Sequence, residues 1–283
     1  MAIPLFVPYP TLAFAPILLA NQVGYLQENS PTIELKMGFM DHYQHILEGN
    51  EPGIVPLMSF VVRAYNRGAH PLVFSAVFNQ VVHRIVAKKE ISNLADLRGR
   101  VVMVNVFGGT SDLEARFVLR KAGVRLEEVS FVEAGADLEM AQLEALRRGE
   151  VDAIASSAPF WYVAEREGFH VLGDVSTHYA KWSPVVLAAE RDWLTSQPSL
   201  PTNLRVIIQE AVNFLTTRPQ EALSALAGVI PELTAEVGAP LIARMRSAWD
   251  TSISAEGLQA YVDEFAAEFH LRAPRVSELV ASP

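Results

Sequence analysis

The 283-residue chain contains no cysteine, which excludes disulfides, a thiolate nucleophile and zinc sites that use sulfur ligands. It also lacks any run near ~18 consecutive apolar residues, so we expect no membrane span. Positive charge is scarce: 23 Lys and Arg stand against 32 Asp and Glu, for a formal net charge of -9. No basic stripe is present of the kind that neutralises phosphates. We therefore expect no nucleic-acid partner.

The amino terminus lacks the features of a secretory signal peptide. Residues 1–7 carry no basic side chain, and prolines at positions 4, 8 and 10 interrupt the apolar stretch. Two locations follow from this pattern: the cytoplasm as the sequence is written, or the periplasm or extracellular space if a leader has been removed.

What the chain does have is a regular alternation of short apolar runs with helical segments. Half of its residues are hydrophobic and 19% are charged, which is typical of a globular protein of about two domains. Glycines such as Gly123 and Gly168 follow the helical segments and are expected to end them. Strands alternating with helices of about a dozen residues predict βαβ units and an α/β fold with parallel-rich sheets. After the last expected strand the pattern predicts helices over 204–216, 221–226, 234–249 and 256–269.

Four stretches in the middle of the chain occur in a characteristic order. They are Ile91-Ser-Asn-Leu-Ala-Asp-Leu-Arg-Gly-Arg-Val101, Gly109-Thr-Ser111, Ala122-Gly-Val124 and Ala145-Leu-Arg-Arg-Gly-Glu-Val-Asp-Ala153. In order and spacing they resemble the second lobe of type II periplasmic solute-binding proteins, in the group that binds nitrate, sulfonates and thiamine precursors. Residues 12–16 and 64–72 resemble the first lobe. One departure is Gly49-Asn-Glu-Pro-Gly53, which lacks the aspartate usual in that family before its next strand.

This resemblance implies two α/β lobes joined by crossing strands, expected near 79–86 and 177–184. Lobe 1 would comprise 1–80 and 183–283, and lobe 2 would comprise 84–180. The implied function is the binding of a small, anionic organic solute (a sulfonate, a carboxylate or a thiamine-precursor-like molecule) in the interlobe cleft. The chain would then be the monomeric substrate-binding component of an ABC-type importer, with a permease partner and no cofactor.

Hydroxyl side chains at expected helix starts are the main candidates for ligand contact. Helix N-termini carry free N–H groups and partial positive charge, which suit anionic oxygens. Hydroxyls stand at four such places, namely Thr11, Ser59, Thr110-Ser111 and Ser156-Ser157. The alternative is plain N-capping, worth ~1 kcal/mol each, with no ligand involved.

Aromatic and turn residues near the expected cleft complete the set. Aromatic rings there would wall an apolar ligand body, or would simply pack in the core. Gly109 permits close backbone approach to a ligand or merely forms a tight turn. Arg84 could pair with an anionic ligand or with a lobe-1 acid. The expected ligand contacts are Tyr9, Thr11, Phe14, Ser59, Asn79, Gly109, Thr110, Ser111, Ser156, Trp161 and Trp182.

Two other functions stay open beside solute import. Some enzymes that share the implied fold, such as aromatic desulfinases, act on small aromatic acids, but Leu12 stands where the desulfinases keep their cysteine. Their thiolate mechanism is thus excluded, and His42 is left as the candidate for a decarboxylase or lyase. The other alternative is a cytosolic ligand sensor. His42 and His45 lack the further ligands of a metal site, so no metal is expected.

Overall fold

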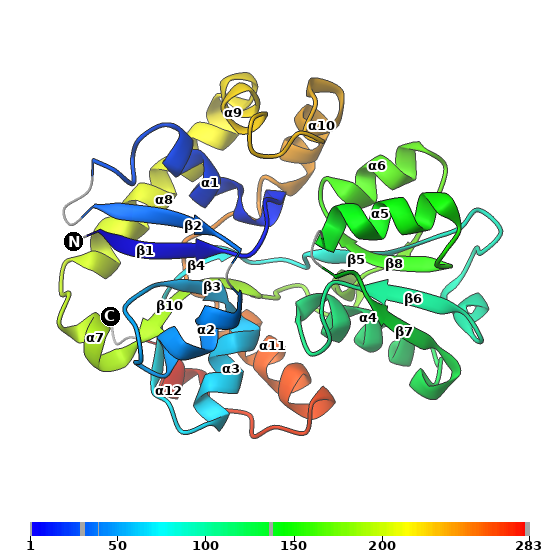
Figure 1. Ribbon diagram of the computed structural model, residues 1–283, viewed down its shortest axis with the longest axis horizontal. Helices are drawn as coiled ribbons and strands as arrows, with labels where there is room; N and C mark the ends of the chain where they lie inside the picture. The colour runs from blue at the N-terminus through cyan, green and yellow to red at the C-terminus, as the bar shows by residue number, and fades with distance from the viewer. Residues whose placement is uncertain (1, 29–31, 39, 136–137, 281–283) are drawn as a thin grey trace. The chain divides into compact units, whose positions relative to one another are not determined.

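The computed structural model describes residues 2–28, 32–38, 40–135 and 138–280 (Figure 1). The chain divides into two compact units. Unit 1 comprises Met1–Gln80 and Lys181–Pro283, and unit 2 comprises Val81–Ala180. From the sequence we expect the units to break at 80, 84, 180 and 183.

The sheet of unit 1 is formed by strands from both ends of the chain. Strand β1 (Ile3–Val7) pairs in parallel with β2 (Ile33–Met37). Strand β10 (Val185–Glu190) pairs antiparallel with both β3 (Val55–Leu57) and β4 (Pro71–Phe78). Every residue of β4 is buried, as its nearly continuous apolar sequence predicts.

Strands β1 and β3 also lie side by side. A parallel bridge joins Leu5 to Ile54, the amide of Phe6 donates to the carbonyl of Ile54 at 3.0 Å, and the amide of Ile54 donates to the carbonyl of Pro4 at 2.9 Å. Because β1 and β3 point the same way, the segments that follow them begin at the same edge of the sheet.

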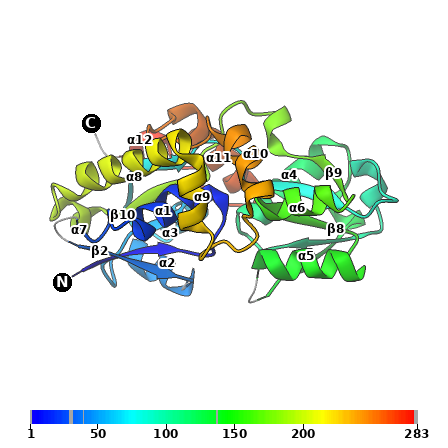
Figure 2. The ribbon, with the colours of Figure 1, turned by 90° about the horizontal axis from the view of Figure 1, so that it is seen from above.

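Helices cover both faces of the unit-1 sheet. Figure 1 shows α1, α8 and α9 on one face and α2, α3, α11 and α12 on the other, and Figure 2 shows α8 running along the unit. The helices of unit 1 are α1 (Ala15–Gln22, preceded by the 3-10 turn Leu12–Phe14), α2 (Met40–Leu47), α3 (Met58–Asn66), α7 (Arg191–Thr195), α8 (Leu200–Thr217), α9 (Pro219–Leu226), α10 (Ala235–Met245), α11 (Ala255–Glu268) and α12 (Val276–Leu279).

Unit 2 is a five-stranded sheet in the order β7-β6-β8-β5-β9. Strand β6 is parallel to β7 and β8, whereas β5 is antiparallel to β8 and β9. Helices α5 and α6 lie on one face and α4 on the other (Figure 1). The elements are β5 (His83–Ala87), β6 (Val101–Val104), α4 (Thr110–Lys121), β7 (Ser130–Glu133), α5 (Leu138–Arg148), β8 (Ala153–Ser157), α6 (Phe160–Arg166) and β9 (His170–Gly173).

Strand β6 is shorter than its sequence predicts. The segment 101–106, which is apolar except for Asn105, predicts a strand through Val106, but β6 ends at Val104. The amide of the next residue, Asn105, donates to the Oγ of Ser111 at 2.9 Å instead of to a neighbouring strand. A side chain of α4 therefore ends the strand.

Candidate functional site

The edge of the unit-1 sheet at which β1 and β3 end brings two predicted hydroxyls to one side of the unit. Thr11 follows β1, and Ser59 is the second residue of α3, directly after β3. Ligands of α/β proteins bind beyond the carboxyl ends of parallel strands, so this edge is a candidate binding surface. We call Thr11, Ser59 and the nearby Tyr9 the unit-1 edge.

Neither Thr11 nor Ser59 caps a helix. Thr11 precedes the 3-10 turn without a side-chain cap bond, and the N-cap position of α3 is Leu57, so the predicted cap at Ser59 is wrong. The Thr11 and Ser59 side chains are 0% and 1% exposed, and Thr11 Oγ1 and Ser59 Oγ have no hydrogen-bond partner. Burying an unsatisfied hydroxyl costs ~1–3 kcal/mol, so a bound molecule that satisfied both would gain that energy.

The aromatic candidates of unit 1 have different surroundings. Tyr9 is partly buried and meets the ring of Phe14 edge-on at 6.1 Å between centroids. Phe14 is itself part of the core. Trp182 is buried against Tyr261 of α11, with ring centroids 5.1 Å apart. The core-packing alternative thus describes what Phe14 and Trp182 do in the structure.

Asn79, directly after β4, forms hydrogen bonds to three other residues of unit 1. Its amide donates to the carbonyl of Ala248 at 2.8 Å, and its Nδ2 donates to the carbonyl of Ser252 at 3.0 Å. Its Oδ1 accepts a hydrogen bond from Ser183 Oγ at 2.6 Å. Since Ser183 stands where the chain returns to unit 1, this side chain links the two chain segments at the unit boundary.

The corresponding edge of unit 2 holds a buried polar network centred on Glu139 of α5. Glu139 Oε2 accepts from Ser156 Oγ at 2.6 Å and from the Ser157 amide at 3.0 Å. Glu139 Oε1 accepts from Asn105 Nδ2 at 3.1 Å and lies 3.7 Å from His83 Nε2. All of these side chains are buried. We call this group, together with Glu114 and Gln142, the unit-2 network.

Glu114 and Gln142 extend the network from helices α4 and α5. Glu114 Oε2 accepts from both the amide and Nδ1 of His83 at 2.8 Å. Gln142 Nε2 donates to Asn105 Oδ1 at 2.9 Å. Neither glutamate is among the residues predicted from the sequence, although both stand in line with apolar helix positions. Glu139, for example, precedes Leu143 by one turn. An acid on the apolar face of a helix was the signal that could have found them.

Hydroxyls at the end of β8 have separate roles. The predicted contact Ser156 donates its hydroxyl to Glu139, whereas Ser157 Oγ is buried and has no partner. Neither caps α6, whose N-cap residue is Pro159 without a side-chain cap bond, so the predicted cap is wrong here as well. Of the two serines, Ser157 is the one whose hydroxyl has no hydrogen-bond partner.

The backbone amides of the loop before α4 already donate hydrogen bonds to other groups of this chain. The amide of Phe107 donates to Glu133 and that of Gly108 to Asp112 Oδ2 at 2.8 Å. A Cβ on Gly109 would lie 2.9 Å from the Val106 side chain, so glycine is required there for packing. The N-cap of α4 is Gly109, which corrects the cap predicted at Thr110 and Ser111; Ser111 Oγ accepts from the Asn105 amide instead.

Arg84 and Trp161 form a stacked pair in unit 2. The guanidinium carbon of Arg84 lies 4.1 Å from the centroid of the buried Trp161 ring, and Arg84 Nε is 3.1 Å from Asp174 Oδ2. Arg84 therefore pairs with an acid of its own unit.

His42 pairs with an acid in unit 1. Its Nδ1 lies 2.8 Å from Glu51 Oε1, and its side chain is 45% exposed. The described residues include no group of three or more His, Cys, Asp or Glu side chains placed to hold a metal ion. Within the same ranges of the chain, no helix has the length and apolar character needed to cross a membrane.

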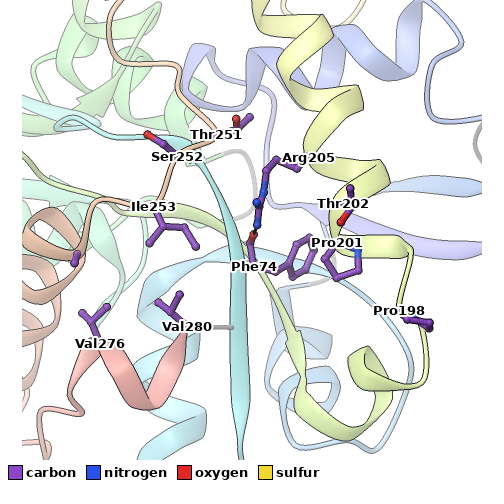
Figure 3. A pocket seen from close by; sticks show the side chains of 11 residues that line it. Phe74, Pro198, Pro201, Thr202, Arg205, Thr251, Ser252, Ile253, Val276 and Val280 are labelled. Atoms are coloured by element: carbon purple, nitrogen blue, oxygen red, sulfur yellow. Dashed lines mark hydrogen bonds between the residues drawn. The ribbon is translucent and has the colours of Figure 1, made fainter. Parts of the chain in front are cut away.

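A separate pocket of ≈ 690 Å³ opens in unit 1 beside β4 (Figure 3). In it, Arg205 of α8 extends to the carbonyl of Phe74 and donates a hydrogen bond at 2.6 Å. Proline, threonine and aliphatic side chains make up much of the remaining lining. None of the predicted ligand contacts is among its lining residues.

Comparison with solved structures shows the class of fold. The alkanesulfonate-binding protein SsuA from Xanthomonas axonopodis pv. citri, bound to MOPS, matches with a TM-score of 0.76 at 17% identity, over 99% of this chain and 98% of that one. The aliphatic sulphonate-binding SsuA of Escherichia coli matches with a TM-score of 0.73 at 17% identity, over 98% and 96%. The chain thus has the α/β type II periplasmic-binding-protein fold, which confirms the fold predicted from sequence.

An enzyme shares this fold. The desulfurization enzyme DszB, as a mutant in complex with biphenyl-2-sulfinic acid, matches with a TM-score of 0.70 at 14% identity, over 98% of this chain and 96% of that one. No curated protein matches by sequence. The NMT1/THI5-like family model matches residues 11–222, and the chain belongs to that family.

Proposed function

We propose that this protein binds a small anionic organic solute at the unit-1 edge, as the substrate-binding component of an ABC-type importer. The observation that carries the proposal is the pair of buried, unpartnered hydroxyls at Thr11 and Ser59. They stand at the end of parallel strands, and Ser59 lies in the first turn of a nine-residue helix. Hydroxyl donors beside a helix N-terminus suit sulfonate or carboxylate oxygens.

The family and the fold matches support the same reading. The solved relatives include two sulfonate-binding proteins and the ligand-binding component of an ABC-type import system from Staphylococcus aureus. Because ligand choice depends on individual side chains, the solute class is proposed from Thr11 and Ser59 and not from those names.

A thermal-shift and calorimetric screen of sulfonates, carboxylates, nitrate and pyrimidines tests the proposal. A ligand should raise the melting temperature by mass action, and Thr11→Val or Ser59→Ala should weaken its binding about tenfold. Ser224→Ala is the matched control, because Ser224 is exposed on α9 and bonds only its own helix. Binding that is unchanged in both edge variants, or no binding by any solute, would refute the proposal.

The same screen separates the enzyme alternative. Mass analysis of each bound solute after incubation should show it unchanged. Conversion that is lost in His42→Asn would instead identify an enzyme that uses the His42–Glu51 pair. Genes for a membrane permease and an ATPase beside this one would support the importer role, and a ligand-binding protein without them would fit a sensor.

A further inference from the structure

We propose that the pocket beside β4 is a second binding site, for a small monocarboxylate with an apolar body. All of its lining residues belong to unit 1, and none of them is a predicted contact of the solute. The inference therefore goes beyond the proposed function and does not depend on it. The pocket volume of ≈ 690 Å³ lies within the range of small-molecule sites.

The pocket opens at a gap along the outer edge of β4, the last strand of its three-stranded sheet. On one side of the gap Val280 bridges to β4, and on the other the Thr251 carbonyl accepts from the Ala76 amide at 3.3 Å. The Phe74 carbonyl lies between these contacts and accepts from Arg205 Nη2 at 2.6 Å. Figure 3 shows the Arg205 side chain extended from α8 to reach it. This hydrogen bond holds the guanidinium in the pocket.

Arg205 brings a positive charge that no acid of the pocket lining balances. Of the eleven described residues that line the pocket, Arg205 alone is charged. It forms no ion pair with any residue that the structure describes, and its bond to Phe74 uses one of its five N–H donors. By contrast, Arg218 at the other end of α8 donates to both carboxylate oxygens of Glu221. Arg205 thus has donors for both oxygens of a carboxylate from outside the chain.

The start of α8 contributes positive potential and a hydroxyl donor. Thr202 and Arg205 lie in the first two turns of this 18-residue helix, whose N-terminus carries about half a positive charge. Two other hydroxyls of the lining already donate within the chain: Thr251 Oγ1 to a glutamine of α8, and Ser252 Oγ to Asp250. The exposed Thr202 hydroxyl bonds to no described residue, so it can donate to a bound anion.

Apolar side chains select an organic ligand over a bare inorganic anion. Pro198 and Pro201 line the pocket near the start of α8, and Ile253, Val276 and Val280 line it elsewhere (Figure 3). Each Å² of apolar ligand surface that they remove from water contributes ~25 cal/mol, a gain that sulfate or phosphate does not have. One guanidinium also balances a single negative charge. The complementary ligand is a monocarboxylate with an aliphatic or aromatic body.

Isothermal titration with matched ligands tests this class. Hexanoate and 4-phenylbutanoate are each compared with the neutral primary amide of the same acid, which keeps the shape and the apolar body. We expect the carboxylate to bind about tenfold tighter than its amide, as one charge-assisted contact provides. Equal affinities for acid and amide, or no binding of either by the wild-type protein, would overturn the proposal.

Variants of the pocket locate the effect. Arg205→Gln should lower the affinity for the carboxylate to that for its amide. Arg218→Gln is the matched control, because Arg218 lies on the same helix, is exposed and has its own acid partner. Ala255→Trp should weaken both ligands, since Ala255 is exposed and lines the pocket, and it tests the site even if Arg205→Gln fails to fold. Wild-type binding in the folded pocket variants would overturn the assignment.

Variants of the unit-1 edge separate this site from that of the proposed solute. Thr11→Val and Ser59→Ala should leave the preference for carboxylate over amide unchanged. If an edge variant abolishes that preference while Arg205→Gln keeps it, the carboxylate binds at the unit-1 edge; this inference then fails and the proposed function stands. If the preference depends on Arg205 but no solute responds to the edge variants, the proposed function fails and the pocket stands.

Discussion

The two units end their parallel strands in chemically different ways. At the unit-1 edge, Thr11 and Ser59 are buried and uncharged, and their hydroxyls bond to nothing in the protein. At the equivalent edge of unit 2, Glu139 ties Ser156, Ser157 and Asn105 into one bonded group. The two edges thus differ in their polar partners: both hydroxyls of the unit-1 edge are unpartnered, whereas in unit 2 the Ser156 hydroxyl is bonded to Glu139 and the Ser157 hydroxyl is unpartnered.

The comparison predicts which polar groups stabilise the protein and which serve binding. Removing a hydroxyl that bonds nothing should cost no stability, whereas removing a member of the unit-2 network should leave its partners buried and unsatisfied. The following predictions run from the largest expected effect to the smallest.

The largest effect is expected for Glu139→Ala. Removing the carboxylate leaves Ser156 Oγ, the Ser157 amide and Asn105 Nδ2 without their acceptor, and we expect a loss of about 3–5 kcal/mol in unfolding free energy. Chemical denaturation followed by circular dichroism measures it. Glu144→Ala, on the exposed side of the same helix, should stay within about 0.5 kcal/mol of wild type. Equal losses in the two variants would mean that Glu139 is not the centre of the network.

A pair of serines tests the contrast most directly. Ser156→Ala removes a donor to a buried carboxylate and should cost about 1–3 kcal/mol, whereas Ser59→Ala removes an unpartnered hydroxyl and should be neutral or slightly stabilising. Thermal unfolding of both proteins without ligand gives the comparison. A comparable loss in Ser59→Ala would show that its hydroxyl is bonded within the protein.

Gly109→Ala tests whether this glycine serves packing. The added methyl would lie 2.9 Å from the Val106 side chain and 3.1 Å from its carbonyl oxygen, so we expect a loss of about 1–3 kcal/mol. Gly228→Ala, where nothing lies within 4 Å, should be neutral or stabilising by up to about 1 kcal/mol. If Gly109→Ala keeps full stability but loses binding, the glycine serves ligand approach instead.

The smallest effect is expected at Asp152. This residue directly precedes β8, at the opposite end of the strand from Ser156 and Ser157. Burial raises the pKa of Asp152, but hydrogen bonds from the Val101 amide and Lys88, helped by Arg100, outweigh it and hold that pKa below its ordinary value. The resulting stability is therefore present above the unfolded pKa of about 3.9 and is lost as pH falls through the lower folded value.

We expect Asp152→Asn to lower the unfolding free energy by about 1 kcal/mol at pH 7. The difference from wild type should shrink as pH falls below about 4, because the carboxyl of the unfolded wild-type chain is protonated there, and it should vanish below the lower pKa of the folded state. Denaturant titrations at pH 7, 5 and 3.5 measure it. A difference that is constant across this range would contradict the assigned role of the charge.

Much of the local structure was determined by the sequence itself. The expected glycine stops at Gly123 and Gly168 have φ of 74° and 88°, a conformation that favours glycine, and they follow α4 and α6 as predicted. Apolar runs such as that of β4 marked buried strands. The placement of Thr11 and Ser59 after strands could also be read directly, because order along the chain sets it.

Only the tertiary structure decided what those polar groups do. Ser59 and Ser156 read alike in the sequence, yet one is unpartnered and the other bonds Glu139, 17 residues away. Glu114 meets His83 across 31 residues. A side chain's burial and its partners depend on which segments fold against it. Periodicity within one segment shows which face of a helix is buried, but it does not show which groups of other segments pack against that face.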